Sequence, residues 1–173
     1  VTMRKKIIIG NWKMNKNTEQ SSQFIQDLNT RVHQLNTAQT DIIIAPPFTS
    51  LHKAQQVLNN SSIKYAGQTL SKHEEGAYTG EISANMLTNL GCTHVLVGHS
   101  ERRLYQHESN EDCNQQLQIA LKHNLIPVYC VGESLEERDS NKTLNVIKTQ
   151  LEKGLENLEF NAENLIIAYE PVW

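Results

Sequence analysis

The sequence predicts an α/β fold built from parallel strands, and two observations lead to this prediction. Short runs of β-branched residues alternate along the chain with longer amphipathic stretches. The short runs are almost continuously apolar, as expected for strands that helices cover on both faces. A strand followed by a helix, repeated, gives right-handed βαβ units and a parallel sheet.

Six strands and five helices are expected in chain order. The strands are predicted at residues 6–10, 41–45, 63–67, 93–97, 126–131 and 165–169. The helices between them are predicted at residues 19–35, 50–59, 83–90, 109–123 and 142–158. The fourth helix has the clearest signals: Leu117, Ala120 and Leu121 fall at helical spacing, and a capping sequence begins at Ser109.

Two architectures fit this alternation, an open doubly wound sheet and a closed eight-stranded (β/α)8 barrel. An open nucleotide-binding sheet should carry a glycine-rich phosphate loop, and neither common form of that motif occurs in the sequence. A barrel instead distributes its chemistry over the ends of several strands. Polar residues follow five of the predicted strands: Asn11 and Lys13, Gln68, His99 and Glu101, Glu133, and Glu170. We therefore predict a single barrel domain over residues 1–173.

Composition narrows the classes of function. The net charge is −3 and the basic residues are scattered, so nothing indicates a nucleic-acid partner. No apolar run approaches the roughly 20 residues of a membrane helix, and no signal-peptide core follows the basic start. The sequence contains neither a zinc motif nor a G-x-S-x-G elbow, so we expect no metal and no serine nucleophile. Cys92, Cys113 and Cys130 form no C-x-x-C pair and are expected to be reduced thiols of a cytoplasmic protein.

The stretch from Val97 to Arg103 is the strongest functional signal. A histidine, a glutamate and two arginines appear where a core strand ends, which is where ligands bind in parallel α/β folds. His99 is the candidate electrophile or acid. It precedes an expected helical turn, whose N-terminus disfavours a positively charged imidazole. The alternative is a structural histidine that bonds to the backbone.

Two other strand ends carry candidates for catalysis. Lys13 lies one turn past the first strand, where its ammonium group can meet an anionic substrate, and Asn11 can hydrogen-bond that substrate or a neighbouring loop. Glu170 ends the sixth strand. At the mouth of an apolar pocket its carboxylate would be desolvated and would be a stronger base. The plainer interpretations are a polar turn at Lys13 and a capping glutamate at Glu170.

Six motifs, in order along the chain, resemble those of the triosephosphate isomerases. They are Asn11-Trp12-Lys13-Met14-Asn15, Ala45-Pro46-Pro47, Gly76-Ala77-Tyr78-Thr79-Gly80-Glu81, Val97-Gly98-His99-Ser100-Glu101-Arg102-Arg103, Cys130-Val131-Gly132-Glu133 and Ala168-Tyr169-Glu170-Pro171-Val172-Trp173. The resemblance extends through all 173 residues and implies a TIM barrel. It also implies the interconversion of dihydroxyacetone phosphate and glyceraldehyde 3-phosphate, a step of glycolysis and gluconeogenesis.

The resemblance implies a role for each site residue. Glu170 is the base that takes a proton from the carbon next to the substrate carbonyl, and neutral His99 polarises that carbonyl. Lys13 offsets the negative charge of the substrate. Asn11 and Trp12 line the same substrate site, and Glu101 supports it from beside Lys13 and His99. No cofactor is implied.

The resemblance also implies a homodimer. Thr79 is expected to reach towards Asn11 and Lys13 of a second subunit, with Met14 and Tyr78 in the same interface. Neither a nucleic acid nor a membrane is expected as a partner.

The length departs from the family pattern. A complete barrel of this type takes about 250 residues, and its phosphate site is built largely from the loops after the last two strands. We favour an enzyme of which this sequence is the first part, because Trp173 falls where the mobile lid of the family begins. The alternatives are a truncated, non-catalytic fragment and an enzyme split over two chains. An aldolase-type barrel enzyme would need a Schiff-base lysine, and the isomerase motif already accounts for Lys13.

Overall fold

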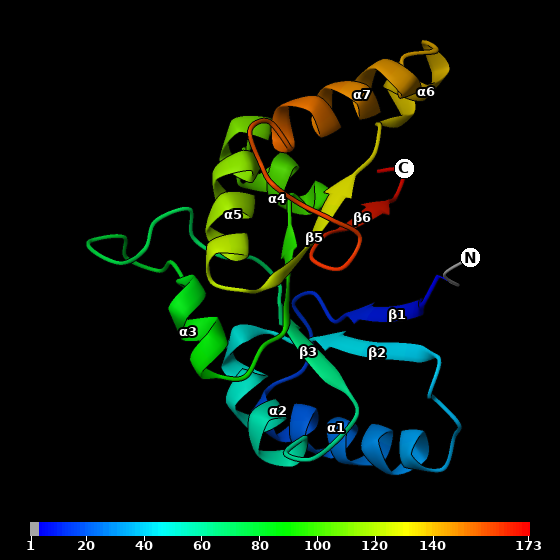
Figure 1. The fold of residues 1–173 in the computed structure, drawn as a ribbon, viewed down its shortest axis with the longest axis vertical. Coiled ribbons are helices and arrows are strands. Elements are labelled where there is room, and N and C mark those ends of the chain that lie inside the picture. Colours follow the sequence, from blue (N-terminus) through cyan, green and yellow to red (C-terminus); the bar gives the residue numbers. More distant parts are fainter. Residues whose placement is uncertain (1–3) are drawn as a thin grey trace. The chain divides into compact units, whose positions relative to one another are not determined.

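The computed structural model describes residues 4–173 (Figure 1), and the chain divides into two compact units. One unit extends to Gln68 and includes Leu87–His94. The other comprises Thr69–Met86 and Val95–Trp173. Helix α3 (Ala84–Asn89) and strand β4 (His94–Val97) each contribute residues to both units.

The first unit is a parallel β-sheet with helices along it. Its strands are β1 (Lys6–Asn11), β2 (Thr40–Ala45) and β3 (Lys64–Gly67), paired in chain order. Its helices are α1 (Thr18–His33), the 3-10 turn η1 (Phe48–Ser50) and α2 (Leu51–Val57), and α1 lies beside α2 (Figure 1). The register places Asn11 opposite Ala45, so β1 and β2 end side by side.

The second unit repeats the pattern. Its strands are β4, β5 (Ile126–Val131) and β6 (Ile166–Tyr169), with β5 and β6 parallel. Its helices are α4 (Ser100–Tyr105), α5 (Asn110–Lys122), α6 (Leu135–Asp139) and α7 (Thr143–Gly154). Helices α5 and α7 pack on each other and on β5 (Figure 1). The register places Val131 opposite Tyr169, so the residues that follow, including Glu133 and Glu170, leave the sheet at the same edge.

Each unit has its own apolar core. Ile25, Ile43 and Leu51 are buried in the first unit, and Val95, Leu117 and Tyr129 are buried in the second. Burying an aliphatic or aromatic side chain of this size stabilises a fold by about 1.5–3 kcal/mol. The sites described below are therefore attached to strands that are held by packing.

Side chains fix where several helices begin. The predicted start of α5 is confirmed, because the Ser109 hydroxyl accepts from the Asp112 N–H while the Asp112 carboxylate accepts from the Ser109 N–H. The same capping box joins Asn17 to Gln20 at α1. Each cap is worth about 1 kcal/mol.

The predicted strands are confirmed to within one residue at each end, and the helices less closely. Helix α6 was not predicted, and α7 ends at Gly154 because residues 155–157 turn instead, with Asn157 at a φ of 60°. The prediction that every strand is covered on both faces is wrong for β1, where Ile8 is 61% exposed, and for β6, where Ile167 is 42% exposed. Both strands stand at an end of the strand order, so each pairs on one side. Among residues 4–173, no helix is both long and apolar enough to cross a membrane.

Candidate active site

The turn after β1 holds Lys13 in an uncommon backbone conformation. The Asn11 side-chain oxygen accepts a hydrogen bond from the Lys13 N–H at 2.9 Å. Lys13 has a φ of 55°, in the left-handed region that residues other than glycine seldom adopt. Such a conformation persists only where the surroundings enforce it, and it is common at ligand-binding positions.

Gln68 is the residue that enforces it. Its amide nitrogen donates to the Lys13 carbonyl and to the Ala45 carbonyl, each at 2.9 Å. One side chain after β3 therefore ties the turn after β1 to the end of β2. The sequence marks Gln68 only as a polar residue at a strand end, and its two partners come from separate segments.

Trp12 and Met14, on either side of Lys13, lie in different surroundings. The Trp12 N–H donates to the Ala45 carbonyl at 3.1 Å, which extends the β1–β2 pairing. The Trp12 ring meets Phe24 of α1 edge to face, with centroids 5.2 Å apart. Met14 is 95% exposed. Trp12 is thus held by packing within its unit, while the side chain of Met14 is exposed.

His99 is the N-cap of α4, and the capping contact defines the tautomer of its neutral ring. Its Nδ1 accepts a hydrogen bond from the Glu101 N–H at 3.1 Å. A ring nitrogen that accepts a hydrogen bond carries no proton, so the neutral imidazole holds its proton on Nε2. A carboxylate oxygen of Glu101 lies 3.6 Å from the same Nδ1, too far for a hydrogen bond. His99 can therefore donate from Nε2.

The backbone before His99 is fixed by Arg103. Its Nε donates to the Gly98 carbonyl at 2.9 Å, and its guanidinium also reaches the Tyr129 hydroxyl at 3.2 Å. Gly98 has a φ of 72°, and a Cβ there would lie 2.9 Å from Cys113 Sγ. Only glycine fits both the conformation and the space, so the approach to His99 is closely determined.

Glu170 follows β6 at a point held from β5. Its N–H donates to the Val131 carbonyl at 2.9 Å, and the Val172 N–H donates to the Glu133 carbonyl at 2.9 Å. The Glu133 carboxylate is fully buried and accepts from the Tyr169 hydroxyl at 2.9 and 3.0 Å. Burial alone would raise the pKa of Glu133, but its backbone N–H and the Tyr169 hydroxyl outweigh burial and lower it. Glu133 thus stays ionised and ties β6 to β5 on either side of Glu170.

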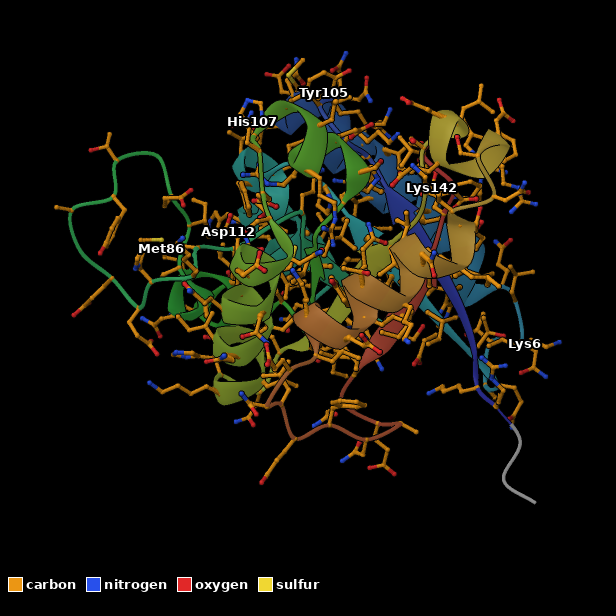
Figure 2. All side chains as sticks on the ribbon, turned by 90° about the horizontal axis from the view of Figure 1, so that it is seen from above. Lys6, Met86, Tyr105, His107, Asp112 and Lys142 are labelled. Carbon is orange, nitrogen blue, oxygen red and sulfur yellow. The ribbon has the colours of Figure 1, made fainter. Side chains whose placement is uncertain are left out.

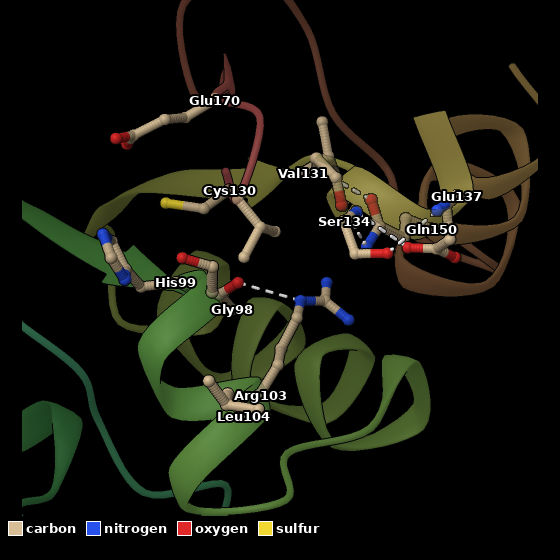
Figure 3. A pocket seen from close by; sticks show the side chains of 13 residues that line it. Gly98, His99, Arg103, Leu104, Cys130, Val131, Ser134, Glu137, Gln150 and Glu170 are labelled. Carbon is tan, nitrogen blue, oxygen red and sulfur yellow. Dashed lines mark hydrogen bonds between the residues drawn. The ribbon is translucent and has the colours of Figure 1, made fainter. Parts of the chain in front are cut away.

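A cavity of about 290 Å³ in the second unit is lined by His99, Cys130 and Glu170, among others. Figure 3 shows the imidazole, the thiol and the carboxylate pointing to the same side. Burial, and then the charge of Glu170, raise the pKa of Cys130 to about 12, so this half-buried thiol stays protonated at neutral pH. The Glu170 side chain is exposed, so the described residues do not supply the desolvation expected from the sequence.

The predicted site residues fall into two groups by unit. Asn11, Trp12, Lys13 and Met14 belong to the first unit, and His99, Glu101 and Glu170 belong to the second, together with the exposed Tyr78 and Thr79. Within the second unit the structure brings His99 and Glu170 to one cavity. Among residues 4–173, no group of three or more histidine, cysteine or acidic side chains is placed to hold a metal ion.

The comparison with known proteins agrees with this geometry. The family model for triosephosphate isomerase matches residues 6–173. The chain belongs to the triosephosphate isomerase family. It is 47% identical to the triosephosphate isomerase of Dictyoglomus thermophilum over 174 aligned residues and 44% identical to that of Alkaliphilus oremlandii over 172. In both cases the alignment covers 99% of this chain and 68% of the relative.

A solved structure gives the fold of the family. The triosephosphate isomerase of Bartonella henselae superposes with a TM-score of 0.91 at 40% identity, over 98% of this chain and 69% of that one. The chain is therefore an α/β protein with the strands and helices of a partial TIM barrel, as the sequence predicted. Membership of the family makes it an isomerase of triose phosphates.

Proposed function

We propose that Glu170, His99, Lys13 and Asn11 carry out the interconversion of dihydroxyacetone phosphate and glyceraldehyde 3-phosphate. The observation that carries the proposal is the hydrogen bond from the Glu101 N–H to His99 Nδ1, which leaves the proton of a neutral imidazole on Nε2. His99 and Glu170 line one cavity, so a donor and a carboxylate base serve the same space. This family is itself a standard example of a carboxylate base beside a neutral histidine, so the agreement on roles is not independent.

The chemistry is a proton transfer between neighbouring carbons. The Glu170 carboxylate removes a proton from the carbon next to the carbonyl, and the electron pair of that C–H bond forms the carbon–carbon double bond of an enediolate. The charge moves to the former carbonyl oxygen, where Nε2–H of His99 stabilises it and donates its proton. His99 regains a proton from the other hydroxyl, and the protonated Glu170 returns its proton to the neighbouring carbon.

Lys13 and Asn11 support the binding of an anionic substrate. Asn11 and Gln68 hold the left-handed backbone of Lys13, which fixes the point at which its side chain leaves the loop. A compact ammonium charge suits the phosphate of a triose phosphate. Trp12 and Glu101 are proposed to complete this set, Trp12 by shaping the loop and Glu101 by holding His99 through its N–H.

We also propose that the active form is a homodimer and that residues 1–173 form the larger part of a single barrel domain of a cytoplasmic enzyme. Met14 is 95% exposed and Tyr78 is 44% exposed, so both side chains are accessible to a second subunit, as the proposed interface requires. Thr79 is the next residue after Tyr78 and is also exposed. The three free cysteines support a reducing compartment.

Two substitutions test the assignment. Glu170→Asp keeps the carboxylate but withdraws it from its attack position, so kcat for glyceraldehyde 3-phosphate should fall by about 10²–10⁴-fold. His99→Gln should lower kcat by a similar factor, with only a small fall in the urea midpoint of unfolding, because the N-cap contact is worth about 1 kcal/mol. A near-normal kcat in Glu170→Asp would remove Glu170 from the base role. A large loss of stability in His99→Gln, with turnover retained per folded molecule, would make His99 structural.

A further inference from the structure

A loop of the second unit, residues 71–82, projects from the fold and is here called the arm (Figure 1). It contains no helix or strand, and residues 74–81 are all exposed. Its base is closed by the Ser71 N–H, which donates to the Ile82 carbonyl at 2.7 Å. Exposed loops of this kind are ordinarily mobile, because few buried contacts hold them.

The arm has its own internal order. The His73 and Tyr78 rings stack face to face, with centroids 3.8 Å apart and planes within 4°. The Glu81 N–H donates to the Tyr78 carbonyl at 3.0 Å. These contacts fold the tip back on the stem, so that Tyr78 and Thr79 occupy defined positions relative to the first residues of the arm.

Side-chain contacts at two points fasten the stem to α5 and its C-cap. Lys72 Nζ lies 2.8 Å from Asp112 in the first turn of the helix (labelled in Figure 2). Glu74 uses both carboxylate oxygens at the other end, one 2.6 Å from Lys122 Nζ and the other 2.7 Å from His123 Nε2. Asp112 and Lys122 are ten positions apart along α5, which corresponds to a rise of about 15 Å. Attachment at two such distant points fixes the direction of the arm as well as its position.

We propose that Glu74, held by Lys122 and His123, is a positioning residue that keeps the arm in the conformation in which its tip docks on a second copy of this chain. The inference rests on the proposed homodimer. A loop held in its bound conformation before association loses less conformational freedom on docking, and the gain appears as affinity. Lys122 lies in the last turn of α5, where positive charge is favourable, so the helix also supports the anchor.

The test measures the dissociation constant of the dimer by sedimentation over a dilution series. Glu74→Gln should raise that constant by about fivefold, the scale expected when exposed ion pairs that order an interface loop are lost. Replacing both partners of Glu74, Lys122→Gln together with His123→Gln, should raise the constant by a similar factor, although neither residue lies in the arm. Adding Glu74→Gln to that pair should not raise the constant further, because all three changes remove the same anchor. Glu75→Gln removes the same charge from the adjacent exposed residue and should leave the constant unchanged.

A positioning role also predicts the activity pattern. At protein concentrations far above the dissociation constant, kcat of Glu74→Gln should return to that of the wild type, and the urea midpoint should stay unchanged. An unchanged dimer affinity in Glu74→Gln would overturn the anchor while leaving the homodimer intact. So would a loss of affinity in Glu74→Gln without one in the variant that lacks both Lys122 and His123, because Glu74 would then act without its two partners on this chain. A wild-type chain that stays monomeric at every concentration would refute the homodimer, and the anchor with it.

Discussion

Acidification should destabilise the first unit through one buried histidine. His94, at the start of β4, is 2% exposed, and its Nδ1 lies 2.6 Å from the Thr93 hydroxyl. Burial, and then the nearby charge of Lys64, lower the pKa of His94 from 6.5 to about 4, while the charge of Asp41 partly opposes them. The folded chain therefore keeps this imidazole neutral at a pH where an unfolded chain would protonate it.

The sign and size of the effect follow from these two pKa values. Above pH 6.5 the imidazole is neutral in both the folded and the unfolded chain, so His94 does not change the free energy of unfolding there. As the pH falls from 6.5 towards about 4, only the unfolded state binds the proton, so the free energy of unfolding decreases. At 1.36 kcal/mol for each pKa unit the full loss is about 3 kcal/mol, and about 2 kcal/mol of it has occurred by pH 5.

Urea unfolding at pH 7.5 and pH 5 measures this loss. The wild type should lose about 2 kcal/mol more than His94→Gln, which has no imidazole to titrate at that position. The matched control is His33→Gln, which removes an exposed histidine of α1 and should behave as the wild type. Asp41 and Asp112 have lowered pKa values, so they lose their stabilising effect at lower pH, below this window. An equal loss in the wild type and in His94→Gln would refute the reasoning.

Two further substitutions probe the strand ends. Gln68→Met removes the hydrogen bonds from Gln68 to the carbonyls of Lys13 and Ala45, each worth about 1 kcal/mol. The KM for glyceraldehyde 3-phosphate should rise about tenfold, with a smaller change in kcat, and an unchanged KM in steady-state kinetics would contradict this role. Tyr169→Phe leaves the buried Glu133 carboxylate without its hydroxyl donor, so the urea midpoint of unfolding should fall by about 0.5 M. The control Tyr105→Phe changes an exposed tyrosine and should leave the midpoint unchanged. Equal midpoints for the wild type and Tyr169→Phe would show that this contact does not stabilise the fold.

The strands could be predicted because their apolar runs are short and continuous, and packing then fixes them. Helix α6 could not be predicted from an apolar stripe, because its five residues, Leu135–Asp139, are mostly charged. Its one sequence signal is the capping box between Ser134 and Glu137, which the hydrogen bonds confirm. A short helix with little buried surface is visible in the sequence only through its cap.

Some contacts of the candidate site could be predicted from the sequence, and others could not. The sequence predicts a helix N-terminus after His99, and in the structure this N-terminus contacts the imidazole through the hydrogen bond from the Glu101 N–H. The role of Gln68 was not accessible, because its acceptors, the carbonyls of Lys13 and Ala45, come together only once three strands pair. The contact between Tyr169 and Glu133 likewise depends on the register of β5 with β6.

The central claim is that this chain isomerises triose phosphates with Glu170 as the base. The most direct test is the steady-state conversion of glyceraldehyde 3-phosphate to dihydroxyacetone phosphate by the purified protein and by Glu170→Gln, which has the same shape but cannot accept the proton. We predict turnover by the wild type and a loss of about 10²-fold or more in the variant, with the same urea midpoint for both. Equal rates for the two proteins would contradict the account.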